Sequence, residues 1–262
     1  MMLPKAQLPT PSAHRAILAL MLREMAATYG RSPGGWIWAV AEPIAAVALL
    51  AFVFQLAFDA PPLGQSFVLF YATGYLPFML FTDVSLKTAN ALRFSRQLLG
   101  YPAITPLDAL IARFVLNLMT QIIVIVLVVL GVEIIFDTGA LYAGPVLLAA
   151  LGLAALLAAG VGCLNCALFH RFPVWERLWQ IITRPLFLVS GIFFLIEDVP
   201  QEYRDIALHN PLLHLTALVR RGVYAPYDAD LANPVFVAGV GLSCLVLGLL
   251  ALRLSGKEPV YA

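Results

Sequence analysis

The chain has 262 residues, of which 61% are hydrophobic and 12% are charged, and its formal net charge is +1. A soluble domain is roughly 45–50% apolar and about 25% charged, so the polar residues here are too few to cover a water-soluble globule. The composition therefore excludes a soluble globular protein and indicates a membrane protein, and the near-neutral charge gives no support for a nucleic-acid partner.

Residues 12–30 come before the first long apolar stretch and predict an amphipathic helix. Ile17 and Met21 share one face of this helix, while Arg23 lies on another. A helix of this kind just before a membrane span is expected to lie in the membrane interface. The residues 32–35, Ser-Pro-Gly-Gly, then break the helix and let the chain turn into the bilayer.

Six later stretches are long and apolar enough to cross a hydrocarbon core of about 30 Å, which takes about 20 residues. We place these spans at 36–58, 66–86, 107–136, 141–169, 178–196 and 233–254. The sequence therefore predicts an all-α membrane protein. We expect one transmembrane domain over 1–262, made of an interface helix at 12–30, spans 1–5 at 36–196, an extracytoplasmic segment at 197–232 and span 6 at 233–254.

The positive charges predict the orientation, because Lys and Arg gather in the cytoplasmic segments of membrane proteins. Thirteen of the sixteen lie on the side that holds both termini, and only Arg204, Arg220 and Arg221 lie on the other side. We therefore expect both termini in the cytoplasm.

Residues 197–234 are too apolar for an ordinary loop and too interrupted for a span, since Asn210 and Pro211 divide them. Two short re-entrant helices fit this pattern if their backbone is buried in protein or lines a cavity. A pair of external amphipathic helices is the alternative.

The sequence carries no motif for nucleotide, metal or hydrolase chemistry. Its one Gly-Lys pair, Gly256-Lys257, is followed by Glu258 where a P-loop needs Ser or Thr. Cys163 and Cys166 lie in an apolar helix, which favours helix packing over a metal site. Charged residues keep to the span ends, so the energy for any transport must come from outside this chain, and we expect no cofactor in it.

Aromatic residues gather in spans 1, 2 and 5 and are candidates for the lining of a translocation path. Their rings offer apolar faces to the C–H surfaces of sugars, and a path needs such attraction to be weak and repeated. The alternative for each ring is contact with lipid or core. The candidates are Phe52, Phe54, Tyr71, Tyr75, Phe78, Phe187, Phe193 and Phe194.

Several short motifs between residues 22 and 220 occur together with this span pattern. They are Arg23-Glu24-Met25, Tyr29-Gly30-Arg31-Ser32, Glu42-Pro43, Ile104-Thr105-Pro106-Leu107-Asp108, Arg184-Pro185-Leu186-Phe187, Ser190-Gly191-Ile192-Phe193-Phe194 and Asn210-Pro211-Leu212 with Arg220. With the interface helix, the spans and the re-entrant segment, they resemble the ABC-2 type permeases, and within these the capsular polysaccharide export (KpsM-like) permeases.

This resemblance implies the ABC-2, or type V, exporter fold and a homodimer around a central path. It implies that ATP and Mg are bound by a separate ATP-binding subunit, on which the loop between spans 2 and 3 docks as a coupling helix. The residues that would make this coupling contact are Arg93, Arg96, Leu98, Leu99 and Tyr101.

The substrate that the resemblance implies is a lipid-linked polysaccharide, exported across the bacterial inner membrane with the help of periplasmic and outer-membrane export proteins. Arginines are the candidate contacts for its phosphate or acidic sugars: Arg23, Arg31 and Arg184 on the cytoplasmic side, and Arg220 and Arg221 on the exit side. Interfacial snorkelling is the alternative for each of them.

The function expected is therefore that of a permease subunit, without enzymatic activity of its own. Two other functions stay open, an ABC-2 exporter of small hydrophobic drugs or lipids and a membrane-embedded enzyme that acts on lipid-linked sugars. The enzyme would need carboxylates or histidines that converge inside the membrane, and the sequence pattern shows none.

Overall fold

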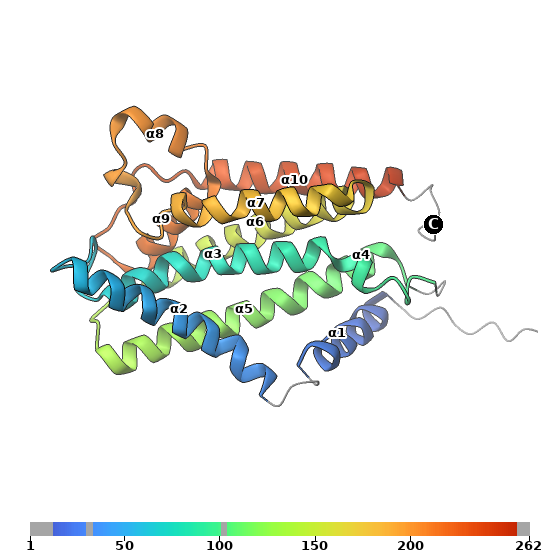
Figure 1. The fold of residues 1–262 in the computed structure, drawn as a ribbon, viewed down its shortest axis with the longest axis horizontal. Coiled ribbons are helices and arrows are strands. Elements are labelled where there is room, and N and C mark those ends of the chain that lie inside the picture. The colour runs from blue at the N-terminus through green and yellow to red at the C-terminus, as the bar shows by residue number, and fades with distance from the viewer. Residues whose placement is uncertain (1–12, 30–33, 101–103, 256–262) are drawn as a thin grey trace, which may run out of the picture.

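The computed structural model describes residues 13–29, 34–100 and 104–255, and within these ranges the chain forms helices and no strand. The all-α class predicted from the sequence is confirmed. The elements, shown in Figure 1, are α1 Ala13–Tyr29, α2 Gly35–Ala57, α3 Phe67–Ala89, α4 Ala91–Phe94, α5 Pro106–Phe136, α6 Gly144–Arg171, α7 Pro173–Val189, η1 Ile196–Asp198, α8 Gln201–Ala207, α9 Pro211–Val223 and α10 Pro234–Ser255.

Five of the described helices, α2, α3, α5, α6 and α10, are long and apolar enough to cross a membrane. Their bounds agree to within three residues with five of the six predicted spans. The remaining prediction, 178–196, corresponds to α7, which begins at Pro173 and ends at Val189 after 17 residues. Gly191, two residues after this end, has φ +75, a left-handed conformation that an α-helix does not continue through.

Helix α3 lies at the centre of the bundle. In its most apolar window 72% of the residues are buried, against 17–39% for the other four candidate spans. It packs against α2, α5, α6 and α9, and Phe70, Leu80 and Val84 on it are fully enclosed. Helices α2, α5 and α6 therefore pack around α3, while α10 packs on α6 and α9. The helices around α3 keep large exposed apolar surfaces of their own, as helices bordered by lipid do.

Helices α6 and α10 form the closest pair, and glycines allow it. A Cβ on Gly160 would lie 2.1 Å from the Gly241 carbonyl oxygen, and one on Gly248 would lie 2.5 Å from the Leu164 nitrogen. Small residues at such a contact let two backbones approach, which is how helices associate in lipid.

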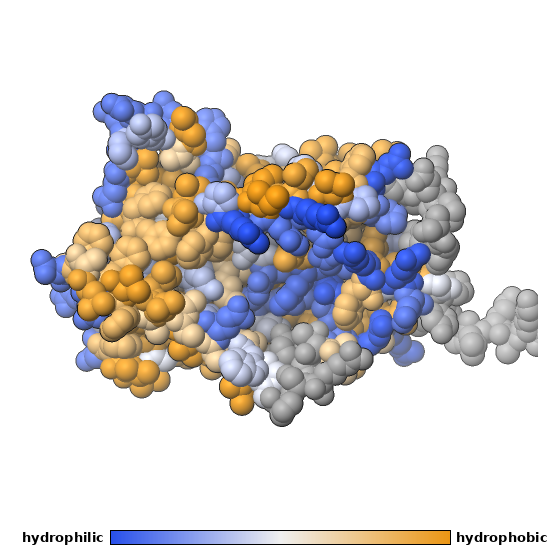
Figure 2. Space-filling view, in the orientation of Figure 1, coloured by the Kyte–Doolittle hydropathy of each residue, from blue (hydrophilic) through white to orange (hydrophobic). Residues whose placement is uncertain are grey.

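The surface is not uniformly apolar. Figure 2 shows orange apolar areas at the margins of one face and a blue hydrophilic band that crosses the region of α3 and α7 toward the α4 end. Polar residues among membrane-length helices are often functional, so this face is a candidate for the functional site.

A larger residue at the α6–α10 contact is expected to destabilise the fold. For Gly160→Leu we expect the free energy of unfolding in detergent to fall by about 1–3 kcal/mol or more, because the added side chain meets the α10 backbone. The matched control is Gly152→Leu on the same helix, where a Cβ meets nothing within 4 Å. Equal melting temperatures for the two variants would contradict the close α6–α10 contact.

Candidate functional site

Six of the eight candidate path aromatics form one continuous strip on α2, α3, α7 and the segment after α7. This aromatic strip consists of Phe54, Tyr71, Tyr75, Phe78, Phe187 and Phe193. The ring centroids lie 5.0 Å apart for Phe54 and Tyr71, 5.6 Å for Phe78 and Phe187, and 5.3 Å for Phe187 and Phe193. These are the separations of rings in direct contact, so residues from three helices form one cluster of rings. Tyr71 and Phe78 are buried within it, whereas Phe54, Tyr75, Phe187 and Phe193 are partly exposed.

The structure does not bring Phe52 and Phe194 into the strip. Phe52 is 62% exposed, and it points away from Phe54 because residues two apart lie on different sides of a helix. Phe194 packs instead with Leu213 and Ala217 of α9.

A groove between α3 and α7 continues the strip toward the α4 end. It has a volume of about 410 Å³ and is lined by Phe78, Thr82, Leu86, Trp179, Gln180, Thr183, Arg184 and Phe187. This α3–α7 groove combines aromatic rings with hydroxyl, amide and guanidinium groups. Rings with a few placed polar groups are typical of small-molecule sites, and here the rings suit the C–H faces of a sugar and the polar groups its hydroxyls.

One face of α7 supplies most of the groove. Trp179, Gln180, Thr183, Arg184 and Phe187 follow a helical spacing that places them together. Sequence reasoning found Arg184 and Phe187 and missed the other three, although the same spacing pointed to them.

Helix α7 as a whole is loosely held. Within the described chain none of its residues is buried, and its other side exposes Ile181 and Leu188. Helix α7 therefore has a polar and aromatic face toward the groove and an apolar face toward its surroundings.

A second group of polar side chains lies across α3 from the groove. Gln121 Nε2 donates to Asp83 Oδ2 at 2.8 Å, and Lys87 Nζ lies 3.7 Å from the same oxygen. Asp83 and Lys87 are four residues apart on α3, a spacing that brings two side chains of a helix together. These charges neutralise each other locally, which reduces the cost of placing them near lipid.

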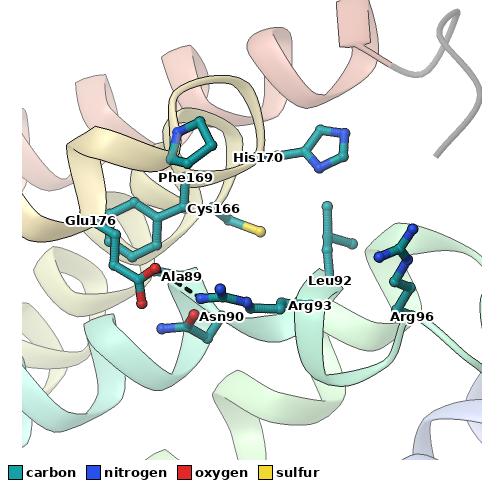
Figure 3. A pocket seen from close by; sticks show the side chains of 10 residues that line it. Ala89, Asn90, Leu92, Arg93, Arg96, Cys166, Phe169, His170 and Glu176 are labelled. Carbon is teal, nitrogen blue, oxygen red and sulfur yellow. Dashed lines mark hydrogen bonds and ion pairs between the residues drawn. The ribbon is translucent and has the colours of Figure 1, made fainter. Parts of the chain in front are cut away.

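The predicted coupling segment begins with α4 and continues through turns to Gly100. Arg93 Nη1 forms an ion pair with Glu176 Oε2 of α7 at 2.8 Å. Figure 3 shows this pair at one side of a pocket of about 330 Å³, with Arg96 and His170 at the other side. Tyr101, like Arg31, lies outside the described residues.

Leu98 and Leu99 anchor this segment. Leu99 is 8% exposed and packs with Leu20 of α1 and Ala109 of α5, and Leu98 is partly buried beside them. Leu99 thus fixes the segment to the bundle and leaves the arginines exposed on its surface.

A buried polar junction ties α1 to α5 and to the coupling segment. Glu24 of α1 is 6% exposed and accepts from Asn117 Nδ2 at 3.3 Å, and its Oε1 lies 3.4 Å from Arg113 Nε. Phe94 lies between two guanidinium groups, that of Arg113 at 4.1 Å and that of Arg23 at 5.8 Å from the ring centroid. Such cation–π contacts and the ion pair make α1, α4 and α5 one structural unit.

The two candidate exit-side arginines differ in environment. Arg221 is exposed, whereas Arg220 is 1% exposed and its guanidinium lies 4.1 Å from the centre of the Phe70 ring. Arg220 donates to the carbonyl oxygens of Phe194 and Ile192 at 2.8 and 3.1 Å. Because protein encloses the Arg220 guanidinium, no passing substrate can reach it in this conformation.

Comparison with known proteins gives the class of this chain. A family model described as ABC-2 type transporter matches residues 15–224, from α1 to the end of α9. The chain therefore belongs to the ABC-2 type transporter family.

The proteins to which this chain is similar include a polysialic acid transport protein and capsule polysaccharide export inner-membrane proteins. The polysialic acid transport protein KpsM of Escherichia coli is 28% identical over 235 residues, which cover 90% of this chain and 91% of that protein. The capsule polysaccharide export inner-membrane protein CtrC of Neisseria meningitidis serogroup A is 28% identical, covering 94% of this chain and 93% of CtrC. BexB of Haemophilus influenzae, which has the same descriptive name, is 26% identical with the same coverage.

The buried and the exposed ion pair are expected to differ in their effect on stability. Glu24→Ala leaves Arg113 buried without its carboxylate, so the free energy of unfolding should fall by about 3 kcal/mol. Glu176→Ala removes the exposed pair with Arg93 and should cost less than about 1 kcal/mol. Chemical denaturation in detergent measures both, and equal costs would contradict the α1–α5 junction.

Proposed function

We propose that this chain is the transmembrane permease subunit of an ATP-driven exporter that moves lipid-anchored capsular polysaccharide across the bacterial inner membrane. The observation that carries the proposal is the aromatic strip joined to the polar α3–α7 groove. The names of the similar proteins, which are polysaccharide transport and export proteins, support the same cargo.

The groove and the strip would act on a sugar chain in sequence. Gln180 offers hydrogen bonds to sugar hydroxyls beside the rings of Trp179 and Phe187. The hydroxyls of Thr82 and Thr183 donate to carbonyls of their own helices and can still accept a hydrogen bond from a sugar. Arg184 would meet a phosphate or an acidic sugar with charge-assisted hydrogen bonds. Further along, the partly exposed rings of the strip offer mainly apolar faces, to which a chain binds weakly enough to keep moving.

A second copy of the chain would enclose this path. Helix α2 has only 17% of its most apolar window buried, and α7 has no buried residue in the described single chain. Both helices border the strip, so a partner placed against them would convert an open face into a lined passage. The same patch on both copies is what a two-fold symmetric dimer uses.

The predicted six-span topology follows if α7 is counted as a crossing. Its 17 residues span about 25 Å, a little less than the hydrocarbon core, and the segment after it adds the rest. Figure 1 shows α1, α4 and the end of α10 at one end of the bundle and α8 and α9 at the other. We assign the first end to the cytoplasm, which places both termini there.

Under this assignment α9 is a re-entrant helix, whereas α8 has no buried residue within the described chain and does not meet the condition set for the second one. Residues 212–220 of α9 are all buried, and α9 packs against α3 and α6. A helix enclosed in this way can lie at membrane depth without exposing its backbone to lipid.

ATP and Mg would be bound by a separate ATP-binding subunit that docks on the coupling segment. Arg93 and Arg96 are exposed there for contact, and the Arg93–Glu176 pair links this segment to α7. Movement of the docked subunit would thus reach the groove through α7. Periplasmic and outer-membrane export proteins would receive the polysaccharide.

A second candidate function is the export of small hydrophobic drugs or lipids, which the aromatic strip taken alone also favours. The polar side chains of the α3–α7 groove favour polysaccharide over a hydrophobic cargo. The Gln180 amide and the Arg184 guanidinium are exposed there and match a glycan, whereas an apolar cargo would leave them unpaired.

Loss of one ring from the path should lower export. Phe187→Ala or Tyr75→Ala should reduce surface polysaccharide about fivefold, since both rings are partly exposed and a ring contact contributes about 1 kcal/mol. Surface polysaccharide is measured per permease molecule in the membrane, and Ile181→Ala, on the other side of α7, is the matched control with unchanged export. Wild-type export by both ring variants would rule out the strip as the path.

Charge reversal in the coupling segment should weaken docking of the ATP-binding subunit. We expect Arg96→Glu to lower the amount that co-purifies about tenfold, because repulsion replaces attraction. Arg177→Glu, an exposed arginine outside the pocket lining, is the control. Unchanged co-purification of Arg96→Glu would contradict the coupling role, and a wild-type chain that purifies without any ATP-binding subunit would contradict the exporter itself.

A further inference from the structure

The segment between α7 and η1 is held by side chains of α9 and its N-cap. Asn210 Nδ2 donates to the Val189 carbonyl at 3.1 Å and to Ser190 Oγ at 3.2 Å. Thr216 Oγ1 donates to the Ser190 carbonyl at 2.9 Å. Arg220 donates to the carbonyls of Ile192 and Phe194. We call Asn210, Thr216 and Arg220 the α9 clasp.

These bonds replace those that the helix loses when α7 ends. A buried carbonyl needs a hydrogen-bond partner, and Thr216 and Arg220 are each only 1% exposed, so water does not substitute easily. The two side chains are four residues apart and therefore lie on one face of α9. Arginine suits this position because its rigid fork of donors reaches two carbonyls at once, which a lysine ammonium does less well.

Helix α3 closes the segment from the opposite side. A Cβ on Gly74 would lie 2.9 Å from the Ile192 Cα. Gly191 has φ +75, and a Cβ there would lie 2.7 Å from side-chain atoms of Leu213 and Thr216. The segment is therefore confined between α3 and α9, and glycine is the residue that fits at both contacts.

The clasp determines where Phe193 lies. Its two neighbours in the chain, Ile192 and Phe194, have their carbonyls fixed by Arg220. The Phe193 ring lies 5.5 Å from Phe54 and 5.3 Å from Phe187, between α2 and α7. This one ring thus bridges the two helices at the α8–α9 end of the aromatic strip.

We propose that the α9 clasp holds Phe193 across the α8–α9 end of the strip as the resting closure of the path, and that Arg220 is the residue that positions it. The inference rests on the proposed function, which supplies the path. Because the clasped segment continues directly from α7, a shift of α7 would displace Phe193 and open the passage.

Passive leak tests the closure without needing transport. The permease with its ATP-binding subunit is reconstituted in liposomes without ATP, and efflux of trapped radiolabelled glucose is measured. Phe193→Ala and Arg220→Gln should each raise efflux about tenfold, as expected when the closed state loses a charge-assisted hydrogen bond or the ring it holds. Arg221→Gln, the exposed neighbour, should leave efflux unchanged.

The double variant Arg220→Gln/Phe193→Ala separates positioning from general damage. It should leak no more than either single variant, because both changes remove the same closure. If the increase in efflux of the double variant equals the product of the two single increases, Arg220 and Phe193 act independently, which would contradict the proposal. If Arg220→Gln does not accumulate in the membrane, Thr216→Val, which removes one clasp bond at nearly constant volume, is measured instead. A Thr216→Val protein as tight as wild type would then overturn the clasp.

The single variants also distinguish this inference from the proposed function. A tight Phe193→Ala protein would show that no passage runs past this ring, which contradicts both the closure and the path. If efflux rises in Phe193→Ala but stays at the wild-type level in Arg220→Gln, the path past Phe193 is supported. The same result would contradict the positioning role of Arg220.

Discussion

A polar group in lipid must find its partner within the protein, and this constraint governs the whole structure. Glu24 is paired with Arg113, Asp83 with Lys87 and Gln121, and Arg220 with two backbone carbonyls. The polar side chains of the α3–α7 groove differ, since Gln180 and Arg184 remain exposed in the single chain. The exposed side chains of Gln180 and Arg184 are therefore available to a polar cargo. For this reason the α3–α7 groove is the candidate site.

Helix α7 connects the two ends of the proposed mechanism. Near its first turn Glu176 pairs with Arg93 of the coupling segment, and beyond its last turn the α9 clasp holds the segment that carries Phe193. Between these ties it packs loosely and presents its polar face to the groove. A helix fixed at its ends and free along its length can transmit a displacement from one end to the other, which the long buried helix α3 cannot do.

Length and hydropathy were enough to predict five membrane-length helices, a helix before the first of them and two short helices before α10, because these depend on local composition. The aromatic strip was also largely predictable, since Tyr71, Tyr75 and Phe78 recur at helical spacing. The end of α7 was not, because it depends on bonds from α9, some 20–28 residues away in sequence. The same long-range contacts explain why Arg220, expected at the exit surface, is buried, and why Leu99, expected to face the ATP-binding subunit, packs against α1 and α5.

The most direct measurement is to place a photo-crosslinking amino acid at position 187 and, separately, at position 181 in cells that export polysaccharide. Phe187 lies in the groove, whereas Ile181 lies on the other side of the same helix. If the α3–α7 groove and the aromatic strip form the path, illumination yields a permease–polysaccharide adduct at position 187 and not at position 181. Equal adducts at both positions, or lipid adducts alone at position 187 during active export, would contradict the path.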